Sequence, residues 1–329
     1  MESSAGIAER SGTALRGGER PRARRPERRP EHHAAEAAPG LIAHTRDYVA
    51  LTKPRIISLL LWTTVMTMFV ARPTGLALST VLWTCLGGYL AAGGAGAINH
   101  YIDRDIDARM GRTRGRPIVS GRIEPVHALV FGIALGVIAT VQLAVTVNAL
   151  AAALALAGLL GYTLMYTAWL KPRTPQNIVI GGAAGAIPPL VGWAAATGSL
   201  TIDAIYPFAI IFLWTPPHFW ALALLISDDY ERTGVPMMPV VRGADYTRTR
   251  ILAYSVVLVT FTIVPVITGL FGGIYLAAAV VLGGAFIIGA ARLLRDHSRR
   301  SALRLYLGSL AYLFLLFAAM AADRVIAFW

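Results

Sequence analysis

Cysteine is nearly absent from this sequence, which contains Cys85 and no other. Disulfides within one chain, zinc knuckles, iron–sulfur clusters and c-type haem attachment all need at least two cysteines, so these sites are excluded. Charge is also scarce, because 15% of the residues are charged and 56% are hydrophobic. In soluble domains roughly a quarter of the residues are charged. The composition therefore predicts a protein embedded in a lipid bilayer.

Acidic residues are few relative to basic ones, at 18 against 30, which gives a formal net charge of +12. Such a charge is typical of proteins that bind nucleic acid, but the basic residues here are confined to the N-terminal segment and to alternate loops between apolar runs. This sequence has no soluble unit in which basic residues form a stripe interleaved with aromatic residues, as a nucleic-acid-binding surface would. We therefore predict no nucleic-acid partner.

The first 45 residues differ in composition from the rest. They are rich in Arg, Pro, Glu and Ala, as in GERPRARRPERRPEHHAAEAAPG, and have almost no large apolar residues. Such a segment cannot bury enough surface to offset its ordering entropy. Mitochondrial presequences are poor in acidic residues, so the glutamates argue against one. The segment also lacks the apolar stretch that a secretory signal contains. We predict a disordered, basic cytoplasmic tail over 1–45 and a membrane domain over 46–329.

Apolar runs of roughly 17–25 residues recur along the rest of the chain, each long enough to cross about 30 Å of hydrocarbon. We place spans at 55–71, 79–99, 125–146, 149–169, 177–196, 204–225, 250–270, 274–292 and 304–323. With the N-terminus inside, all of the 30 Lys and Arg residues except Arg72 and Arg324 fall on inner segments. This partition favours an all-α bundle of nine transmembrane helices with the N-terminus inside and the C-terminus outside.

The second span leads into a polar motif, in which Asn99, Asp103 and Asp107 follow an i, i+4, i+8 spacing. On a helix these side chains share one face, whereas Asp105 points elsewhere. Amide and carboxylate oxygens suit Mg²⁺, which combines protein carboxylates with substrate phosphates. Ionisable groups at the edge of a span are typical of functional sites. The motif predicts a metal-bound diphosphate, although a solvated loop would also carry acids.

Basic residues follow the motif, and Arg112 and Arg116 are again four residues apart. They could grip phosphate oxygens in bidentate fashion, with Gly111 and Gly115 allowing a tight turn, or they could serve topology alone. Three further basic residues are expected on the same membrane face, where they would either contact phosphate or extend to lipid headgroups. They are Lys53, Lys171 and Arg173.

Two histidines are candidates for a substrate pocket. His218 lies in WTPPHFW, where two indoles, an imidazole and a predicted helix break at Pro216-Pro217 could accommodate a large flat ligand. Imidazole is also a common axial ligand of haem iron. His100 directly follows Asn99. A lone buried histidine is more often structural, so both remain hypotheses at this point.

Five segments together are similar to one known family. The string NHYIDRDIDARM at 99–110 resembles the first aspartate motif of the UbiA-type intramembrane prenyltransferases, and the fuller set resembles the haem-farnesylating (protohaem IX farnesyltransferase) branch of that family. The set also comprises LTKPR at 51–55, KPRTPQN at 171–177, WTPPHFW at 214–220 and DDYER at 228–232. One departure stands out: relatives that act on quinone precursors have a second Asp-x3-Asp motif, whereas here Asp228 and Asp229 are adjacent.

The resemblance implies farnesyl diphosphate and haem b as substrates, haem O and diphosphate as products, and Mg²⁺ as cofactor. It implies metal binding by Asn99, Asp103, Asp107 and one or both of Asp228 and Asp229. A prokaryotic plasma membrane, an active site on the cytoplasmic side and a downstream haem-modifying or oxidase-assembly partner are further expectations. The alternatives are a prenyltransferase of an aromatic quinone precursor and a secondary transporter, which would also have many spans and buried acids.

Overall fold

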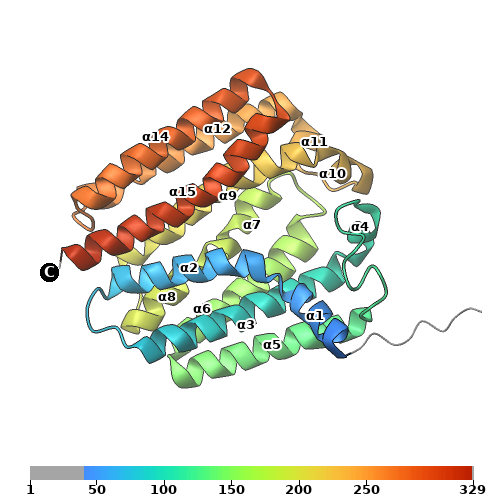
Figure 1. Cartoon of the computed structure of the whole chain (residues 1–329), viewed down its shortest axis with the longest axis horizontal. Coiled ribbons are helices and arrows are strands. Elements are labelled where there is room, and N and C mark those ends of the chain that lie inside the picture. Colours follow the sequence, from blue (N-terminus) through green and yellow to red (C-terminus); the bar gives the residue numbers. More distant parts are fainter. Residues whose placement is uncertain (1–40, 328–329) are drawn as a thin grey trace, which may run out of the picture. The chain divides into compact units, whose positions relative to one another are not determined.

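Long apolar helices dominate this chain, whose computed structural model describes residues 41–327 (Figure 1). Within that range no strand occurs, and nine helical segments are long and apolar enough to cross a membrane. They are α2 (Pro54–Ala71), α3 (Leu78–Ile102), α5 (Pro125–Thr146), α6 (Ala149–Leu160) with the π-helix η1 (Gly161–Leu170), α7 (Asn177–Gly185) with α8 (Ile187–Thr197), the 3₁₀ turn η2 (Ile202–Ala204) with α9 (Ile205–Leu225), α12 (Ala244–Phe261) with α13 (Val264–Ile267), α14 (Gly273–Asp296) and α15 (Arg299–Ile326). The predicted spans are thereby confirmed, with ends shifted by a few residues.

The spans close into a ring. Helices satisfy every backbone polar group within one segment, which is the requirement for crossing hydrocarbon. Consecutive spans pack side by side, and the last span, α15, also packs against the first, α2. Large side chains such as Trp220, Tyr275 and Phe317 are fully buried inside, while Val137 and Val141 on α5 are more than half exposed. The exposed apolar outer face matches a lipid environment.

The two-residue connection between α5 and α6, residues 147–148, is fixed by one side chain. Asn148 accepts a hydrogen bond from the backbone N–H of Ala151 at 2.8 Å, which caps α6. Its Nδ2 donates to the carbonyl of Ala194 on α8, also at 2.8 Å. A capped start of this kind separates α5 from α6 as two helices.

The predicted break in the sixth span is wrong. Pro216 and Pro217 lie inside α9, which continues as one helix from Ile205 to Leu225. Neighbouring helices in a membrane bundle let a proline-containing helix persist, because they and local adjustments satisfy the freed carbonyls. The interruption occurs instead in the fifth span, where Ala186 separates α7 from α8 ahead of Pro188 and Pro189.

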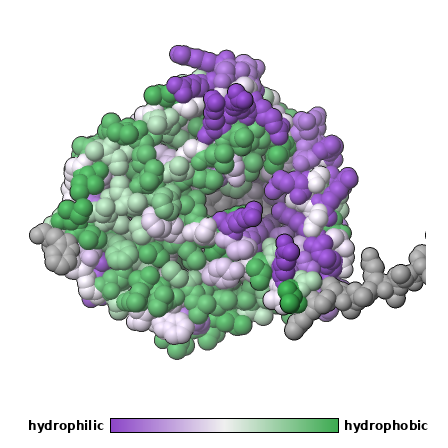
Figure 2. Space-filling model, in the orientation of Figure 1, coloured by the Kyte–Doolittle hydropathy of each residue, from purple (hydrophilic) through white to green (hydrophobic). Residues whose placement is uncertain are grey.

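Four short helices gather at one end of the bundle, at the right of Figure 1: α1 (Leu41–Thr52), α4 (Arg104–Arg109), α10 (Ser227–Thr233) and α11 (Met238–Arg242). Figure 2 shows hydrophilic surface at this end and a hollow beside it. The Arg122 Nε donates to both oxygens of Asp47 at 3.0 Å, which ties α1 to the loop after α4. The predicted tail lies mostly outside the described residues, but its boundary at residue 45 falls inside α1.

Close contact between α2 and α8 depends on Gly192. A Cβ atom at this position would lie 2.2 Å from the carbonyl oxygen of Thr64. Gly192→Ala should therefore force the helices apart and lower the free energy of unfolding by about 1–3 kcal/mol. Thermal unfolding in detergent would measure the effect. Gly284→Ala is the matched control, because no atom beyond the backbone of its own helix and its chain neighbours lies within 4 Å of the new Cβ. Equal loss in both variants would contradict the close-packing argument.

Candidate active site

The three oxygen-bearing residues of the predicted metal motif lie together where α3 meets α4. The helical pattern continues across this junction, because the N–H of Asp103 bonds to the carbonyl of Asn99 and that of Asp107 to the carbonyl of Asp103. The i, i+4, i+8 spacing therefore keeps the side chains on one face. All three are almost fully buried, with at most 4% of each residue exposed.

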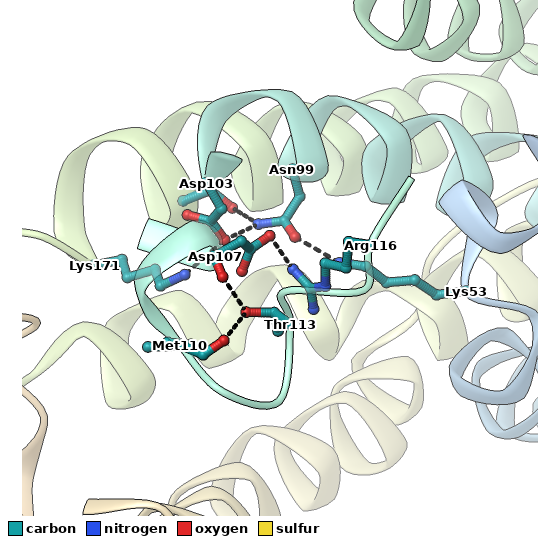
Figure 3. Close-up of polar contacts among 9 residues, drawn as sticks. Lys53, Asn99, Asp103, Asp107, Met110, Thr113, Arg116 and Lys171 are labelled. Atoms are coloured by element: carbon teal, nitrogen blue, oxygen red, sulfur yellow. Dashed lines mark hydrogen bonds and ion pairs between the residues drawn. The ribbon is translucent and has the colours of Figure 1, made fainter. Parts of the chain in front are cut away.

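Two lysines from distant segments reach this face. Lys53, between α1 and α2, donates its Nζ to Asn99 Oδ1 at 2.5 Å. Lys171, just after η1, donates to Asp103 Oδ2 at 2.6 Å and is itself nearly buried (Figure 3). The same Asp103 oxygen accepts from Asn99 Nδ2 at 2.8 Å. The lysines thus hold side-chain oxygens of Asn99 and Asp103 in place.

Lys53 sits in an unfavourable environment and conformation. Burial, and secondarily the nearby Arg116, lower the pKa of Lys53 to about 7. Its backbone has φ +58°, a left-handed conformation that costs a non-glycine residue roughly 1–3 kcal/mol. Such costs persist where the surrounding structure imposes the conformation, and they cluster at functional sites. We therefore regard Lys53 as part of the site.

Asp107, the third predicted oxygen ligand, pairs with an arginine. Arg116 forms a hydrogen-bonded ion pair with Asp107, and the Thr113 hydroxyl donates to the Asp107 carbonyl at 2.8 Å (Figure 3). Burial raises the pKa of Asp107, an effect that Arg116 opposes. Arg112 is exposed and forms no hydrogen bond or ion pair with Asn99, Asp103 or Asp107, although its charge, like that of Arg116, opposes the rise that burial causes in the pKa of Tyr230. Of the two arginines that were predicted to act as a pair, Arg116 is thus the one that contacts the motif.

The donor set fits a magnesium ion completed by phosphate oxygens. Asp103 Oδ1 is buried and has no hydrogen-bond partner among the described residues, which leaves an oxygen available for a cation. Two carboxylates and an amide oxygen are hard ligands of the type that Mg²⁺ prefers. Within residues 41–327 no group of three or more His, Cys, Asp or Glu side chains is placed so that it could hold a metal ion by itself. An ion held here would therefore need further oxygens from a substrate.

The second acidic loop lies against the first. Helix α10 contacts α4, and a Cβ atom added at Gly111 would lie 4.0 Å from Asp229 Oδ1. Asp229 pairs with Arg232, whereas Asp228 is exposed and accepts from the hydroxyl of Ser227 at 3.3 Å. Of the adjacent pair, Asp229 is therefore the one placed toward the loop of the first motif.

The two candidate histidines have different surroundings. His218 on α9 shares a 2.6 Å hydrogen bond between its Nδ1 and the hydroxyl of Ser309, and its ring is stacked between Trp214 and Tyr306. His100 on α3 is 4% exposed, and neither of its ring nitrogens has a partner among the described residues. His218 is thus rigidly held, while His100 has unused hydrogen-bonding capacity beside the oxygen ligands.

One predicted residue lies apart from the site, and one contributing residue escaped prediction. Arg173 is exposed and its Nη1 donates to the carbonyls of Ala168 and Trp169, which caps the end of η1. Thr167, within the π-helix η1, accepts a hydrogen bond from Asn99 Nδ2 at 3.1 Å. π-helical turns are frequent at functional sites, but no residue pattern in the sequence announces this one.

Comparison with known proteins assigns this chain to a family. The model of the UbiA prenyltransferase family matches residues 60–319. The chain belongs to the UbiA prenyltransferase family. The resemblance drawn from the sequence motifs is thereby confirmed, and membership of UbiA argues against the transporter alternative.

Curated relatives match most of the chain. The protoheme IX farnesyltransferase of a Roseiflexus species is 54% identical over 292 residues, which are 88% of this chain and 54% of that protein. The protein of that name from Alkalilimnicola ehrlichii is 49% identical over 292 residues, which are 89% of this chain and 97% of that protein. The chain spans about half the length of the Roseiflexus and Chloroflexus relatives that it matches.

Solved structures share the fold at low sequence identity. A structure of digeranylgeranylglyceryl phosphate synthase has a TM-score of 0.72 and 17% identity, covering 86% of this chain and 99% of that chain. A UbiA homologue from Archaeoglobus fulgidus, bound to GPP and Mg²⁺, has a TM-score of 0.62 and 16% identity, covering 85% and 99%. At these identities the likeness shows the fold.

Proposed function

We propose that this chain transfers the farnesyl group of farnesyl diphosphate to the 2-vinyl group of haem b, giving haem O and diphosphate. The observation that carries the proposal is the identity of about one half to relatives named protoheme IX farnesyltransferase over most of the chain. The buried cluster of oxygen ligands and bases supports it, because such a cluster suits a metal-bound diphosphate.

The diphosphate would bind at Asn99, Asp103 and Asp107, which would hold Mg²⁺. When bound, Mg²⁺ neutralises the diphosphate and makes it a better leaving group. Lys53, Lys171 and Arg116 already lie at hydrogen-bonding distance from these ligands. On substrate binding we expect the bases to turn toward phosphate oxygens and stabilise the charge that develops as the C1–O bond breaks.

The farnesyl cation would form within the bundle, where apolar walls exclude bulk water. The terminal vinyl carbon of haem bonds to farnesyl C1, one water molecule adds its oxygen to the neighbouring vinyl carbon, and one proton is released. We propose that His218, held by Ser309 and two aromatic rings, orients the haem. His100 would contact a substrate from the side of the oxygen ligands.

Further features of this proposal concern the surroundings of the site. We propose that Asp229, rather than Asp228, assists metal binding, since it is the one placed toward the loop after α4. Orientation with the N-terminus inside, location in a prokaryotic plasma membrane, a cytoplasmic active site and transfer of haem O to a downstream haem-modifying or oxidase-assembly protein belong to the same proposal.

A transfer assay with two acceptors tests the function. Purified protein in detergent is supplied with farnesyl diphosphate, Mg²⁺ and either haem b or 4-hydroxybenzoate, and the products are separated by chromatography. We expect conversion of haem b into a less polar haem whose mass increases by one farnesyl group and one hydroxyl group. Prenylation of 4-hydroxybenzoate with unchanged haem would instead assign the chain to quinone precursors.

Removal of divalent metal should abolish this transfer. Because Asp103 and Asp107 supply only two protein carboxylates, the ion depends on substrate phosphates and should be lost readily to chelators. We expect EDTA to reduce haem conversion by at least about 10³-fold, since metal stabilisation of a leaving group contributes several kcal/mol. Added Mg²⁺ should restore the rate. Full activity in EDTA would contradict a metal-dependent mechanism.

A further inference from the structure

A small cavity lies away from the candidate active site, among the ends of four helices on the side of α10 and α11. Its volume is about 140 Å³. It lies among the end of α9, the start of α12, the end of α14 and the start of α15. Its lining includes Leu224, Arg248, Leu293, His297, Ser298 and Arg299. The cavity therefore combines apolar side chains with two guanidinium groups.

Arg248 lines this cavity with unused hydrogen-bonding capacity. Its side chain is 14% exposed, and it donates from Nη1 to Asp245 at 2.6 Å and from Nη2 to the carbonyl of His297 at 3.5 Å. Its Nε is buried without a partner among the described residues. A guanidinium has five N–H donors. Asp245 is 80% exposed, so solvent weakens that ion pair and Arg248 can still attract an anion.

The start of α15 adds positive charge on the same side. Arg299 is exposed, and its Nη1 donates a 2.9 Å hydrogen bond to the carbonyl of Leu225. The nearby acid, Asp296, is engaged by the backbone N–H of Ser298 and the hydroxyl of Ser301. The 28-residue helix α15 also presents the positive end of its dipole here.

The position of the cavity matches the headgroup level of a bilayer. Spans α9 and α14 end here and spans α12 and α15 begin here, so the cavity lies at the boundary of the hydrocarbon. Figure 2 shows hydrophilic surface at the top of the view, where Figure 1 places the turn between α14 and α15. Leu224 and Leu293 provide apolar walls beside the arginines. A ligand with an anionic head and an apolar body would satisfy both.

We propose that this cavity binds the phosphate of an anionic phospholipid, with Arg248 and Arg299 contacting the phosphate and the two leucines contacting the glycerol and first acyl carbons. Basic pockets between transmembrane helices are known to bind anionic lipid headgroups. The proposal is independent of the transferase function, because the site shares no residue with the cluster of oxygen ligands.

Native mass spectrometry of the delipidated full chain tests the proposal with phosphatidylglycerol as probe. We expect one retained lipid, whose dissociation constant rises about fivefold or more in Arg248→Gln and in Arg299→Gln. Arg299 is exposed, so its variant should fold even if Arg248→Gln does not. Arg300→Gln is the matched control, since it removes the same charge from the next position of α15 without altering the cavity lining.

Two results would overturn the assignment. Equal weakening by Arg300→Gln and Arg299→Gln would show unspecific attraction to a basic surface. Displacement of phosphatidylglycerol by equimolar inorganic phosphate would show that the site recognises a soluble anion rather than a lipid. Weaker retention of zwitterionic phosphatidylcholine, together with no competition by inorganic phosphate, would support the anionic lipid.

Discussion

Asp103→Asn should reduce farnesyl transfer by at least about 10³-fold while leaving the protein folded. The substitution keeps the shape and one oxygen but removes the negative charge from the centre of the cluster, where Oδ2 accepts from Lys171 and Oδ1 has no partner among the described residues. Metal stabilisation of the leaving group contributes several kcal/mol, and each 1.4 kcal/mol corresponds to about a factor of ten. Chromatography of haem products measures the rate.

Asp105→Asn provides the matched control for this experiment. Asp105 lies on the same short helix, α4, but its side chain is 81% exposed and its nearest cation is Arg104 at 3.9 Å. We expect a change in rate of less than about twofold, because a surface pair of this kind contributes little. Comparable losses in both variants would show that acidity of the loop, rather than the buried oxygens, controls the reaction.

The positions of the spans were predictable because the bilayer imposes a simple rule on sequence. A run of about 20 apolar residues satisfies its backbone only as a helix across the hydrocarbon, so every span could be located from composition. The short helices at the hydrophilic end follow no such rule. Helix α1 was not predicted, because it is held by contacts between distant residues such as Arg122 and Asp47. The continuity of α9 through Pro216 likewise depends on the neighbouring helices.

The candidate site was predictable to the extent that it is local. The spacing of Asn99, Asp103 and Asp107 fixes a common face on any helix, so their proximity follows from the sequence. The partners of these residues depend on which spans become neighbours. The sequence does not predict that Lys171 bonds to Asp103, 68 positions away, or that Arg116 rather than Arg112 pairs with Asp107. It also does not predict that Arg173 caps a π-helix.

Lys171→Met should lower the transfer rate by about 10²-fold or more, because it removes a buried donor expected to stabilise the departing diphosphate. The loss has two possible physical origins. Lys171 donates to Asp103 at 2.6 Å, so it could act only by holding that carboxylate in place. Alternatively, it could leave Asp103 and contact phosphate directly once substrate is bound. The rate of the single variant does not separate these origins, whereas substrate binding in a double variant does.

Binding of a non-reacting analogue, farnesyl S-thiolodiphosphate, would be measured in the wild type, Asp103→Asn, Lys171→Met and the double variant. If Lys171 only restrained Asp103, its removal would have no further effect in the Asp103→Asn background. We expect instead that Lys171→Met weakens binding about tenfold or more in both backgrounds, since a hydrogen bond from an ammonium to a charged phosphate contributes roughly 1.5–3 kcal/mol. Persistence of the loss after the carboxylate is gone requires that the lysine contact the substrate, and its disappearance would confine Lys171 to a positioning role.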